Sequence, residues 1–206
     1  MPARRAFLKL GAAFGLAQLA SSEAIAQPPV EPWAARLLEA AHAQVGVTVM
    51  YDPAYVSLSY PNGDVPRERG VCTDVVIRAY RDAFGLDLQK LVHDDMRGSF
   101  SAYPGNWGLT RPDRSIDHRR VPNLETFFRR SGWALPVTDD AGDWRPGDLF
   151  SQRLPGGQPH IGMVSDRMNG AGTRPLVVHN IGAGARVEDI LFTFRRVGHF
   201  RVPPPA

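Results

Sequence analysis

The sequence predicts a single α+β domain, with helices in its first half and an antiparallel sheet in its second half. Apolar residues recur at helical spacing up to about residue 130, whereas short apolar runs between glycine and proline turns follow residue 144. Helices and strands segregated in this way along a chain are typical of an α+β fold. We expect no domain boundary within residues 33–202.

The first 26 residues are predicted to be a twin-arginine export signal. Arg4 and Arg5 precede Phe-Leu-Lys, an apolar stretch over residues 10–20, and a small-residue cleavage site at residues 24–26. This apolar stretch is too short and too rich in alanine and glycine for a membrane-spanning helix, and no later segment has the ~20 apolar residues that a span needs. We therefore expect a periplasmic or secreted protein with no membrane span in the mature chain.

The remaining segment, residues 27–206, is long enough for one domain with a sizeable core. Most of the formal net charge of +3 lies in the predicted export signal, so the mature domain is nearly neutral. Nucleic-acid binding usually requires a clustered basic face, and we expect no nucleic-acid partner.

Four helical segments are expected in the first half. Apolar spacing predicts a helix over residues 33–45, and another from Cys72 to Phe84 that Gly85 ends. A short helix over residues 87–96 follows. After a long irregular loop, Asn123 is a possible cap for a last helix that ends at residue 130.

Strands are expected from residue 149 onward. The Pro-Gly turn at residues 146–147 precedes the first strand, and a second follows over residues 160–165. Residues 176–181 form a third, and residues 192–201 contribute one or two more. The glycine-rich stretch 182–184 does not open into a recognisable helix, so it does not indicate a nucleotide-binding loop.

Cys72 is the only cysteine in the chain and is the candidate nucleophile. Exported proteins normally use cysteines in pairs as disulfides, so an unpaired thiol is either inert and buried or kept for its reactivity. Cys72 opens a predicted helix, where the helix dipole favours the nucleophilic thiolate. The position favours the reactive alternative.

Two histidines are candidates for the groups that would assist Cys72. His160 opens a strand after a glycine turn and could act as the general base. His179, near the end of the following strand, could orient the ring of His160, and Asn180 competes for that role. Since successive strand residues point to opposite faces, His179 and Asn180 cannot both face His160.

These residues lie in segments that resemble the NlpC-type papain-like cysteine peptidases of the bacterial cell wall. The resemblance covers the helix 72–86, the Pro-Gly-Asp-Leu turn at 146–149, the strand 160–164 and the Val178-His179 pair. It implies a papain-like fold, with a nucleophile helix packed on a small antiparallel sheet, and a catalytic trio of Cys72, His160 and His179. It also implies that Tyr60 helps to hold the oxyanion.

The pattern is also similar to an uncharacterised bacterial group, domain of unknown function 1287. The shared segments are residues 116–124 and 179–182. The chain departs from the peptidases in having Thr73-Asp74 after the cysteine, in place of Ser-Gly, so Asp74 changes the floor around the nucleophile. It also carries a longer loop over residues 97–122.

That loop is predicted to narrow the groove and to contact substrate. Loops of this length without regular structure are usually functional. Asp117 is available for an amine and Arg119 or Arg120 for a carboxylate, and His118 is a further candidate. The alternative is a brace, in which Asp117 caps a turn.

The sequence therefore predicts an exported cysteine hydrolase that cleaves an amide bond in a peptidoglycan stem peptide. The competing interpretation is a catalytically inactive papain-like binding module of the cell envelope. We expect no cofactor. A zinc site made by Cys72, His160 and His179 is a lesser alternative, since the chain has no short-range ligand pair. The oligomeric state is left open.

Overall fold

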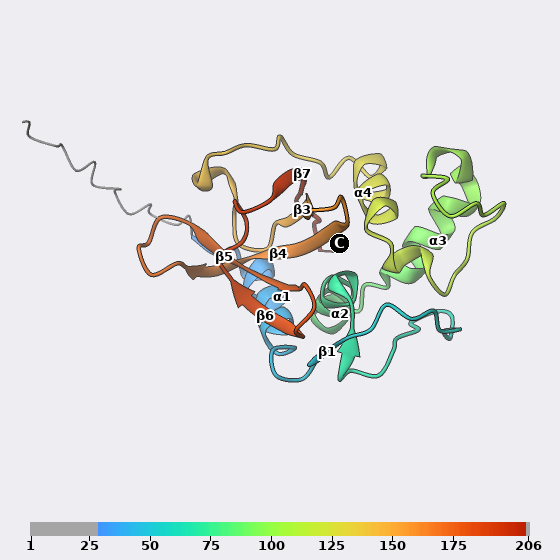
Figure 1. Ribbon diagram of the computed structural model, residues 1–206, viewed down its shortest axis with the longest axis horizontal. Coiled ribbons are helices and arrows are strands. Elements are labelled where there is room, and N and C mark those ends of the chain that lie inside the picture. Colours follow the sequence, from blue (N-terminus) through green and yellow to red (C-terminus); the bar gives the residue numbers. More distant parts are fainter. Residues whose placement is uncertain (1–28, 205–206) are drawn as a thin grey trace, which may run out of the picture.

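A computed structural model describes residues 29–204, and the predicted export signal lies outside these residues. The description contains four α-helices, followed by a five-stranded antiparallel sheet (Figure 1), and this confirms the α+β class. The helices are α1 (Pro32–His42), α2 (Cys72–Phe84), α3 (Leu88–Ser99) and α4 (Val121–Arg130). No helix within the described range is long and apolar enough to cross a membrane.

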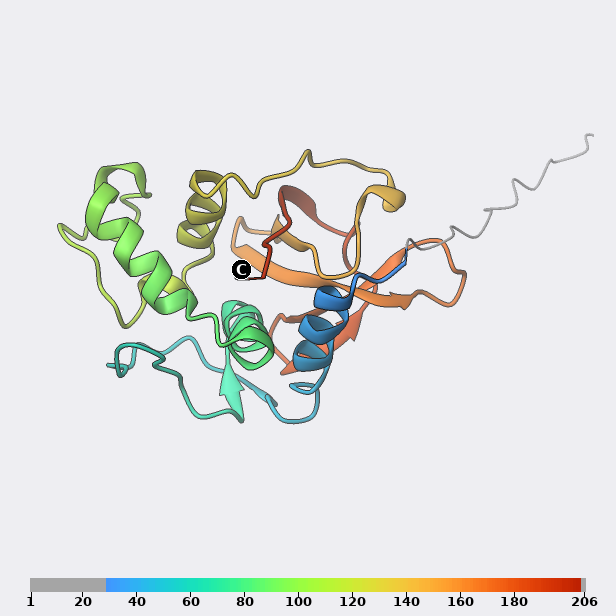
Figure 2. The same ribbon diagram turned by 180° about the vertical axis from the view of Figure 1, so that it is seen from behind.

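The sheet has the strand order β6-β5-β4-β3-β7, with every neighbouring pair antiparallel. Its strands are β3 (Leu149–Arg153), β4 (Pro159–Met168), β5 (Pro175–Asn180), β6 (Ala185–Glu188) and β7 (Arg195–Phe200). A separate parallel pair joins β1 (Met50–Tyr51) to β2 (Arg69–Gly70), directly before α2. Helices α1 and α2 lie side by side against the sheet, while α3 and α4 extend to one side (Figures 1 and 2).

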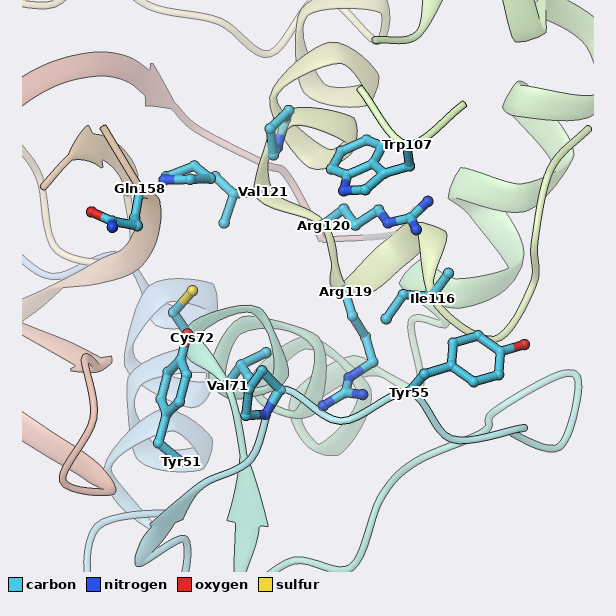
Figure 3. A pocket seen from close by; sticks show the side chains of 13 residues that line it. Tyr51, Tyr55, Val71, Cys72, Trp107, Ile116, Arg119, Arg120, Val121 and Gln158 are labelled. Atoms are coloured by element: carbon cyan, nitrogen blue, oxygen red, sulfur yellow. The ribbon is translucent and has the colours of Figure 1, made fainter. Parts of the chain in front are cut away.

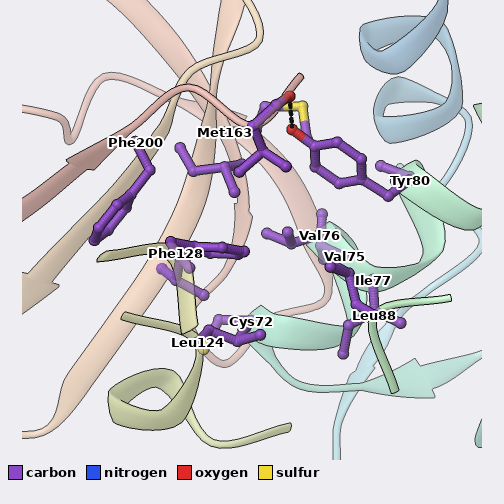
Figure 4. Packing of buried hydrophobic residues seen from close by; sticks show 14 of the residues in the cluster. Cys72, Val75, Val76, Ile77, Tyr80, Leu88, Leu124, Phe128, Met163 and Phe200 are labelled. Carbon is purple, nitrogen blue, oxygen red and sulfur yellow. Dashed lines mark hydrogen bonds between the residues drawn. The ribbon is translucent and has the colours of Figure 1, made fainter. Parts of the chain in front are cut away.

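The core lies between α2, α4 and the sheet. Val76 and Tyr80 of α2 pack with Phe128 of α4 and with Met163 and Phe200 of the sheet (Figure 4). Each such side chain contributes about 1.5–3 kcal/mol when fully buried. The Tyr80 hydroxyl donates to the Val202 carbonyl at 3.1 Å, which satisfies its one polar group inside the core.

Helix α2 has the predicted bounds because local signals define both ends. Val71 is extended, so the helix starts at Cys72, and Gly85 adopts a left-handed φ of 66° that ends it. The Gly85 N–H donates to the Arg81 carbonyl at 2.8 Å. The start of α2 therefore carries the candidate nucleophile.

One local prediction is wrong, and one strand was missed. Helix α4 begins at Val121, so Asn123 is not its cap, and the Asn123 amide instead donates to the Asp117 carbonyl at 3.1 Å. The stretch 182–184 leads into β6, a strand that was not predicted. Gly184 has a φ of 84°, and a Cβ there would lie 2.5 Å from the Thr48 carbonyl oxygen, so the turn requires glycine.

The long loop is also more ordered than predicted. Helix α3 continues to Ser99 and passes directly into a short 3₁₀ turn, η1 (Phe100–Ala102). A second turn, η2 (Asp117–Arg119), leads into α4, and a third, η3 (Ala141–Asp143), precedes the sheet.

Candidate active site

Cys72 lies at the start of α2 and lines a pocket of about 460 Å³ (Figure 3). The first turn of the helix is held by Asp74, whose carboxylate accepts from the Val71 N–H at 2.6 Å. Strand β2 passes very close to this carboxylate, since a Cβ at Gly70 would lie 3.0 Å from Asp74 Oδ2. The thiol is consequently fixed by a short strand, a glycine and a helix cap.

The thiol of Cys72 is neutral in the resting protein. Burial is the strongest influence and raises its pKa, and the Asp74 carboxylate acts in the same direction. The backbone N–H groups of Ile161, Thr73 and Cys72 itself lower it, but the pKa still rises to about 11. The raised pKa disfavours the resting thiolate that we expected at the helix start, because desolvation outweighs the helix terminus.

A hydrogen-bonded chain of three side chains runs across the sheet from β6 to β4. His160 Nε2 lies 3.1 Å from His179 Nδ1, and His179 Nε2 lies 2.9 Å from Glu188 Oε2. We call Glu188, His179 and His160 the histidine chain. The Ile161 N–H hydrogen-bonds with the Cys72 sulfur. His160 directly precedes Ile161 on β4, so it is the sequence neighbour of a residue that contacts the thiol.

Strand register builds this chain. Gly162 pairs with His179 across β4 and β5, while His160 lies two residues before Gly162 on the same face. A Cβ at Gly162 would lie 2.8 Å from His179 Cβ, so glycine leaves the room in which the two imidazoles meet. Glu188 on β6 occupies the diagonal position next to His179, because His179 pairs with Arg186.

The hydrogen-bond network assigns the tautomers of both histidines. The ionised Glu188 carboxylate only accepts, so His179 Nε2 carries the proton and His179 Nδ1 is an acceptor. His160 Nε2 must then be the donor to His179, which leaves the lone pair on His160 Nδ1. Burial, followed by the neighbouring His179, lowers the pKa of His160 to about 3, so the ring is neutral and is a weaker base than a free imidazole.

Asp74 is not available to a substrate. Its two oxygens accept from Arg119 Nε and Nη2, each at 2.9 Å, and the pair is almost completely buried. Arg119 also donates to the carbonyls of Asp52 and Ala54. The predicted substrate-binding or oxyanion role of Asp74 is therefore replaced by a structural one, in which it joins α2, η2 and the segment after β1.

The tyrosine at the site is Tyr51, not Tyr60. The Tyr60 hydroxyl donates to Asp94 at 3.2 Å, its ring packs on His93, and it does not line the Cys72 pocket. The Tyr51 hydroxyl points at Cys72 (Figure 3) and hydrogen-bonds with it, while burial, followed by Cys72, raises the pKa of Tyr51 to about 12. The pairing of Tyr51 with Gly70 brings it there.

Asp117 and His118 face inward and do not line the Cys72 pocket. Asp117 accepts from the Asp113 N–H and from Arg120, which is the brace that the sequence left as an alternative. His118 is buried, and this burial, followed by Arg119, lowers its pKa to about 3. Neither side chain has the predicted contact with substrate.

Asn180 also lies away from His160. Its amide donates to the Gly70 carbonyl at 3.0 Å, and its oxygen accepts from the Gly182 N–H. Strand alternation thus directs His179 to His160 and Asn180 to β2, where Asn180 supports the backbone that precedes Cys72.

The long loop does reach the pocket, through the predicted residues Arg119 and Arg120 and also through Trp107 and Ile116. Trp107, Ile116 and Arg120 line one end, and Gln158 lies on the side of Cys72 (Figure 3). Sequence reasoning missed Tyr51, Glu188 and Gln158. Only Glu188 left a local signal, the short polar-apolar alternation of residues 185–188. Within residues 29–204, no group of three or more histidine, cysteine or acidic side chains could hold a metal ion.

Two comparisons with known proteins give the same result. The family model described as "Domain of unknown function (DUF1287)" matches residues 38–202. The chain is 50% identical over 209 residues to the "Uncharacterized protein YijF" of Escherichia coli (strain K12), covering 98% of each chain. Neither description assigns an activity.

Proposed function

The chain belongs to the DUF1287 family, and we propose that it is an exported cysteine hydrolase with a papain-like arrangement of Cys72, His160 and His179. The observation that carries the proposal is the histidine chain, whose His160 directly precedes Ile161, the residue whose N–H hydrogen-bonds with the pocket-lining Cys72 thiol. The bond cleaved is an amide, and the substrate class is the stem peptide of peptidoglycan, which an export signal would place in the same compartment.

The reaction starts from a neutral pair. His160 Nδ1 takes the Cys72 proton while the sulfur attacks the amide carbonyl, so the thiolate exists only as the new C–S bond forms. The resulting imidazolium donates through Nε2 to His179, whose other nitrogen is hydrogen-bonded with the Glu188 carboxylate. His160 then protonates the leaving amine as the C–N bond breaks, which leaves the acyl group on the Cys72 sulfur as a thioester. A water molecule, deprotonated by His160, hydrolyses this thioester, and the proton returns to the Cys72 sulfur.

The oxyanion of the tetrahedral intermediate needs preorganised donors. The Cys72 N–H belongs to the first turn of α2, where backbone N–H groups have no partner within the helix. The Tyr51 hydroxyl hydrogen-bonds with the Cys72 thiol and is the second donor within reach of the reacting carbonyl. Tyr51 thus takes the role that the resemblance implied for Tyr60.

The binding-module alternative is favoured by one observation, the raised pKa of Cys72. A buried neutral thiol beside a rigid Asp74–Arg119 pair also suits a groove that binds peptide without turnover. The hydrolase requires proton transfer from Cys72 to His160, whereas the binding module does not.

The test is hydrolysis of purified muropeptides by the mature protein, read by mass spectrometry. Cys72→Ala and His160→Ala should each remove hydrolysis, with a loss of about 10⁴-fold or more. His93→Ala is the matched control, because His93 lies on α3 against Tyr60 and outside the pocket. Unchanged hydrolysis in Cys72→Ala would disprove the mechanism. Binding of muropeptides without cleavage by the wild type would favour the binding module.

A further inference from the structure

The pocket beside Cys72 is lined by two arginines and by no described aspartate or glutamate. Arg119 and Arg120 are the two ionised side chains that line it, and no described lining residue is an aspartate, glutamate or lysine. Each arginine is ion-paired with a carboxylate behind the lining, so an anionic ligand can bind only to the donors that these pairs leave free.

The two arginines differ in how many of their N–H donors are free to bind a ligand. Arg119 donates through Nε and Nη2 to Asp74, and further to two backbone carbonyls, with its side chain almost fully buried. Removing it from those acceptors would leave the Asp74 carboxylate buried without its partner, which is very costly. Arg119 is a structural residue.

Arg120 is held in place but keeps donors free. Its guanidinium lies over the Trp107 ring, 4.1 Å from the centroid, and Nη1 donates to Asp117 at 3.2 Å (Figure 3). Within residues 29–204, Nε and Nη2 donate to no side chain or carbonyl group at hydrogen-bond distance. Stacking and the Asp117 contact fix the plane of the fork, so little conformational entropy is lost when an anion binds.

Neighbouring acids do not occupy these donors. Asp117 is buried behind Arg120, where its second oxygen accepts from the Asp113 N–H. The Asp113 carboxylate accepts from the Tyr55 hydroxyl at 3.1 Å and from the Ser115 N–H at 2.9 Å. Both carboxylates are thus engaged outside the pocket lining.

We propose that Arg120, stacked on Trp107, binds a free carboxylate of the substrate at the end of the pocket opposite Cys72. The substrate is then a peptide that places an anionic group at one end of the pocket and the scissile amide at the other. The catalytic part of this inference rests on the proposed function, whereas carboxylate-selective binding does not require turnover.

The binding test uses the Cys72→Ala protein, which cannot turn over the ligand. Purified muropeptides with free stem-peptide carboxylates, and the same muropeptides with these groups converted to amides, are titrated by calorimetry. A charge-assisted bidentate contact predicts about tenfold to a hundredfold tighter binding of the free acids. Adding Arg120→Gln should remove most of that preference, because the charged planar fork is lost.

Arg114→Gln is the matched control, because Arg114 lies over Tyr60 and outside the Cys72 pocket. It should leave the preference unchanged. Arg120→Lys keeps the charge without the planar fork and should give an intermediate preference. Thermal unfolding of each variant checks the fold. A preference that survives in a folded Arg120→Gln protein, or equal or absent binding of both muropeptide forms to Cys72→Ala, overturns the inference.

Kinetics separates this inference from the proposed function. Cys72-dependent hydrolysis with the same carboxylate preference in Arg120→Gln would overturn the inference and leave the hydrolase intact. Carboxylate-selective binding that Arg120→Gln removes, in a protein whose hydrolysis does not depend on Cys72, would overturn the hydrolase and leave the binding site intact.

Discussion

The Cys72 pocket has a sheet wall and a loop wall, and different interactions position the side chains on each. On the sheet side, register alone aligns Glu188, His179 and His160, and the hydrogen bonds are donated in one direction, from His160 to His179 and from His179 to Glu188. On the loop side, ion pairs and a cation–π contact position the side chains, and most of the charges neutralise one another. The sheet wall is suited to proton transfer, and the loop wall to binding.

The comparison shows why charged loop residues are poor guides to substrate contacts. Asp74, Asp117 and Arg119 all lie near the site in sequence or space, yet their polar atoms are bonded to protein. A long loop that packs on a domain needs buried partners for its backbone and side chains. Among the described residues of the loop that line the pocket, Arg120 keeps guanidinium donors without a protein partner, and this is why we propose it as the recognition residue.

The largest expected effect comes from breaking the loop wall at Arg119. Arg119→Met leaves the Asp74 carboxylate buried without a partner, which should lower the free energy of unfolding by about 3–5 kcal/mol. Urea unfolding followed by circular dichroism measures it. Arg195→Met, at an exposed position, is the control and should change stability by less than about 0.5 kcal/mol. Equal small losses would show that the pair does not hold the loop.

Glu188→Gln tests whether the sheet wall sets the tautomers. A glutamine amide can donate to His179 Nε2, which would reverse the chain and place the proton on His160 Nδ1. We expect kcat for muropeptide hydrolysis to fall about tenfold to a hundredfold with little change in KM, by analogy with loss of the orienting acid in other triads.

The ¹⁵N chemical shifts of the two imidazoles provide a readout that a purely structural role would not change. In the wild type both Nε2 atoms should carry the proton, and in Glu188→Gln both Nδ1 atoms should. Glu39→Gln, on the exposed face of α1, is the control. Unaltered tautomers together with unaltered kcat would remove Glu188 from the mechanism.

The burial of Cys72, His160 and His118 predicts that the free energy of unfolding is largest near neutral pH. The folded protein keeps Cys72 protonated up to about pH 11, whereas the unfolded thiol ionises near 9, so stability falls as pH rises through that interval. The pKa values of His160 and His118 are lowered to about 3, so the unfolded chain takes up protons first and stability also falls as pH drops below about 6.5.

Chemical unfolding of the wild type and of Cys72→Ala at pH 7 and pH 10 isolates the thiol. The wild type should lose about 1 kcal/mol more than the variant between these pH values. Alkylation of Cys72 by iodoacetamide should likewise be slow at pH 6 and accelerate toward pH 11. Fast alkylation at pH 6 would mean that a thiolate is already present in the resting site.

The smallest effect on kcat is expected from Tyr51→Phe, which removes the hydroxyl that we propose as one of the two oxyanion donors. We expect kcat to fall about tenfold, less than for a fixed backbone donor, because the Tyr51 side chain is partly exposed. Tyr60→Phe is the matched control, since the Tyr60 hydroxyl bonds with Asp94 on α3. A larger loss from Tyr60→Phe would reverse the assignment of the two tyrosines.

The sequence by itself determined the elements whose signals are short-range. Helix α2 begins at Cys72 and ends before Gly85 as predicted, and His160 and His179 lie on neighbouring strands. Caps, left-handed glycines and apolar periodicity act over a few residues, so they can be recognised without knowledge of the rest of the chain.

Tertiary structure decided which side chains meet and how they ionise. The parallel pairing of β1 with β2 selects Tyr51 over Tyr60, and the register of β6 adds Glu188 to the histidine chain. Register depends on the packing of a whole sheet, and the pKa of Cys72 depends on desolvation by residues from both halves of the chain. Neither quantity is encoded in any local stretch, because each is a sum over contacts between residues far apart in sequence.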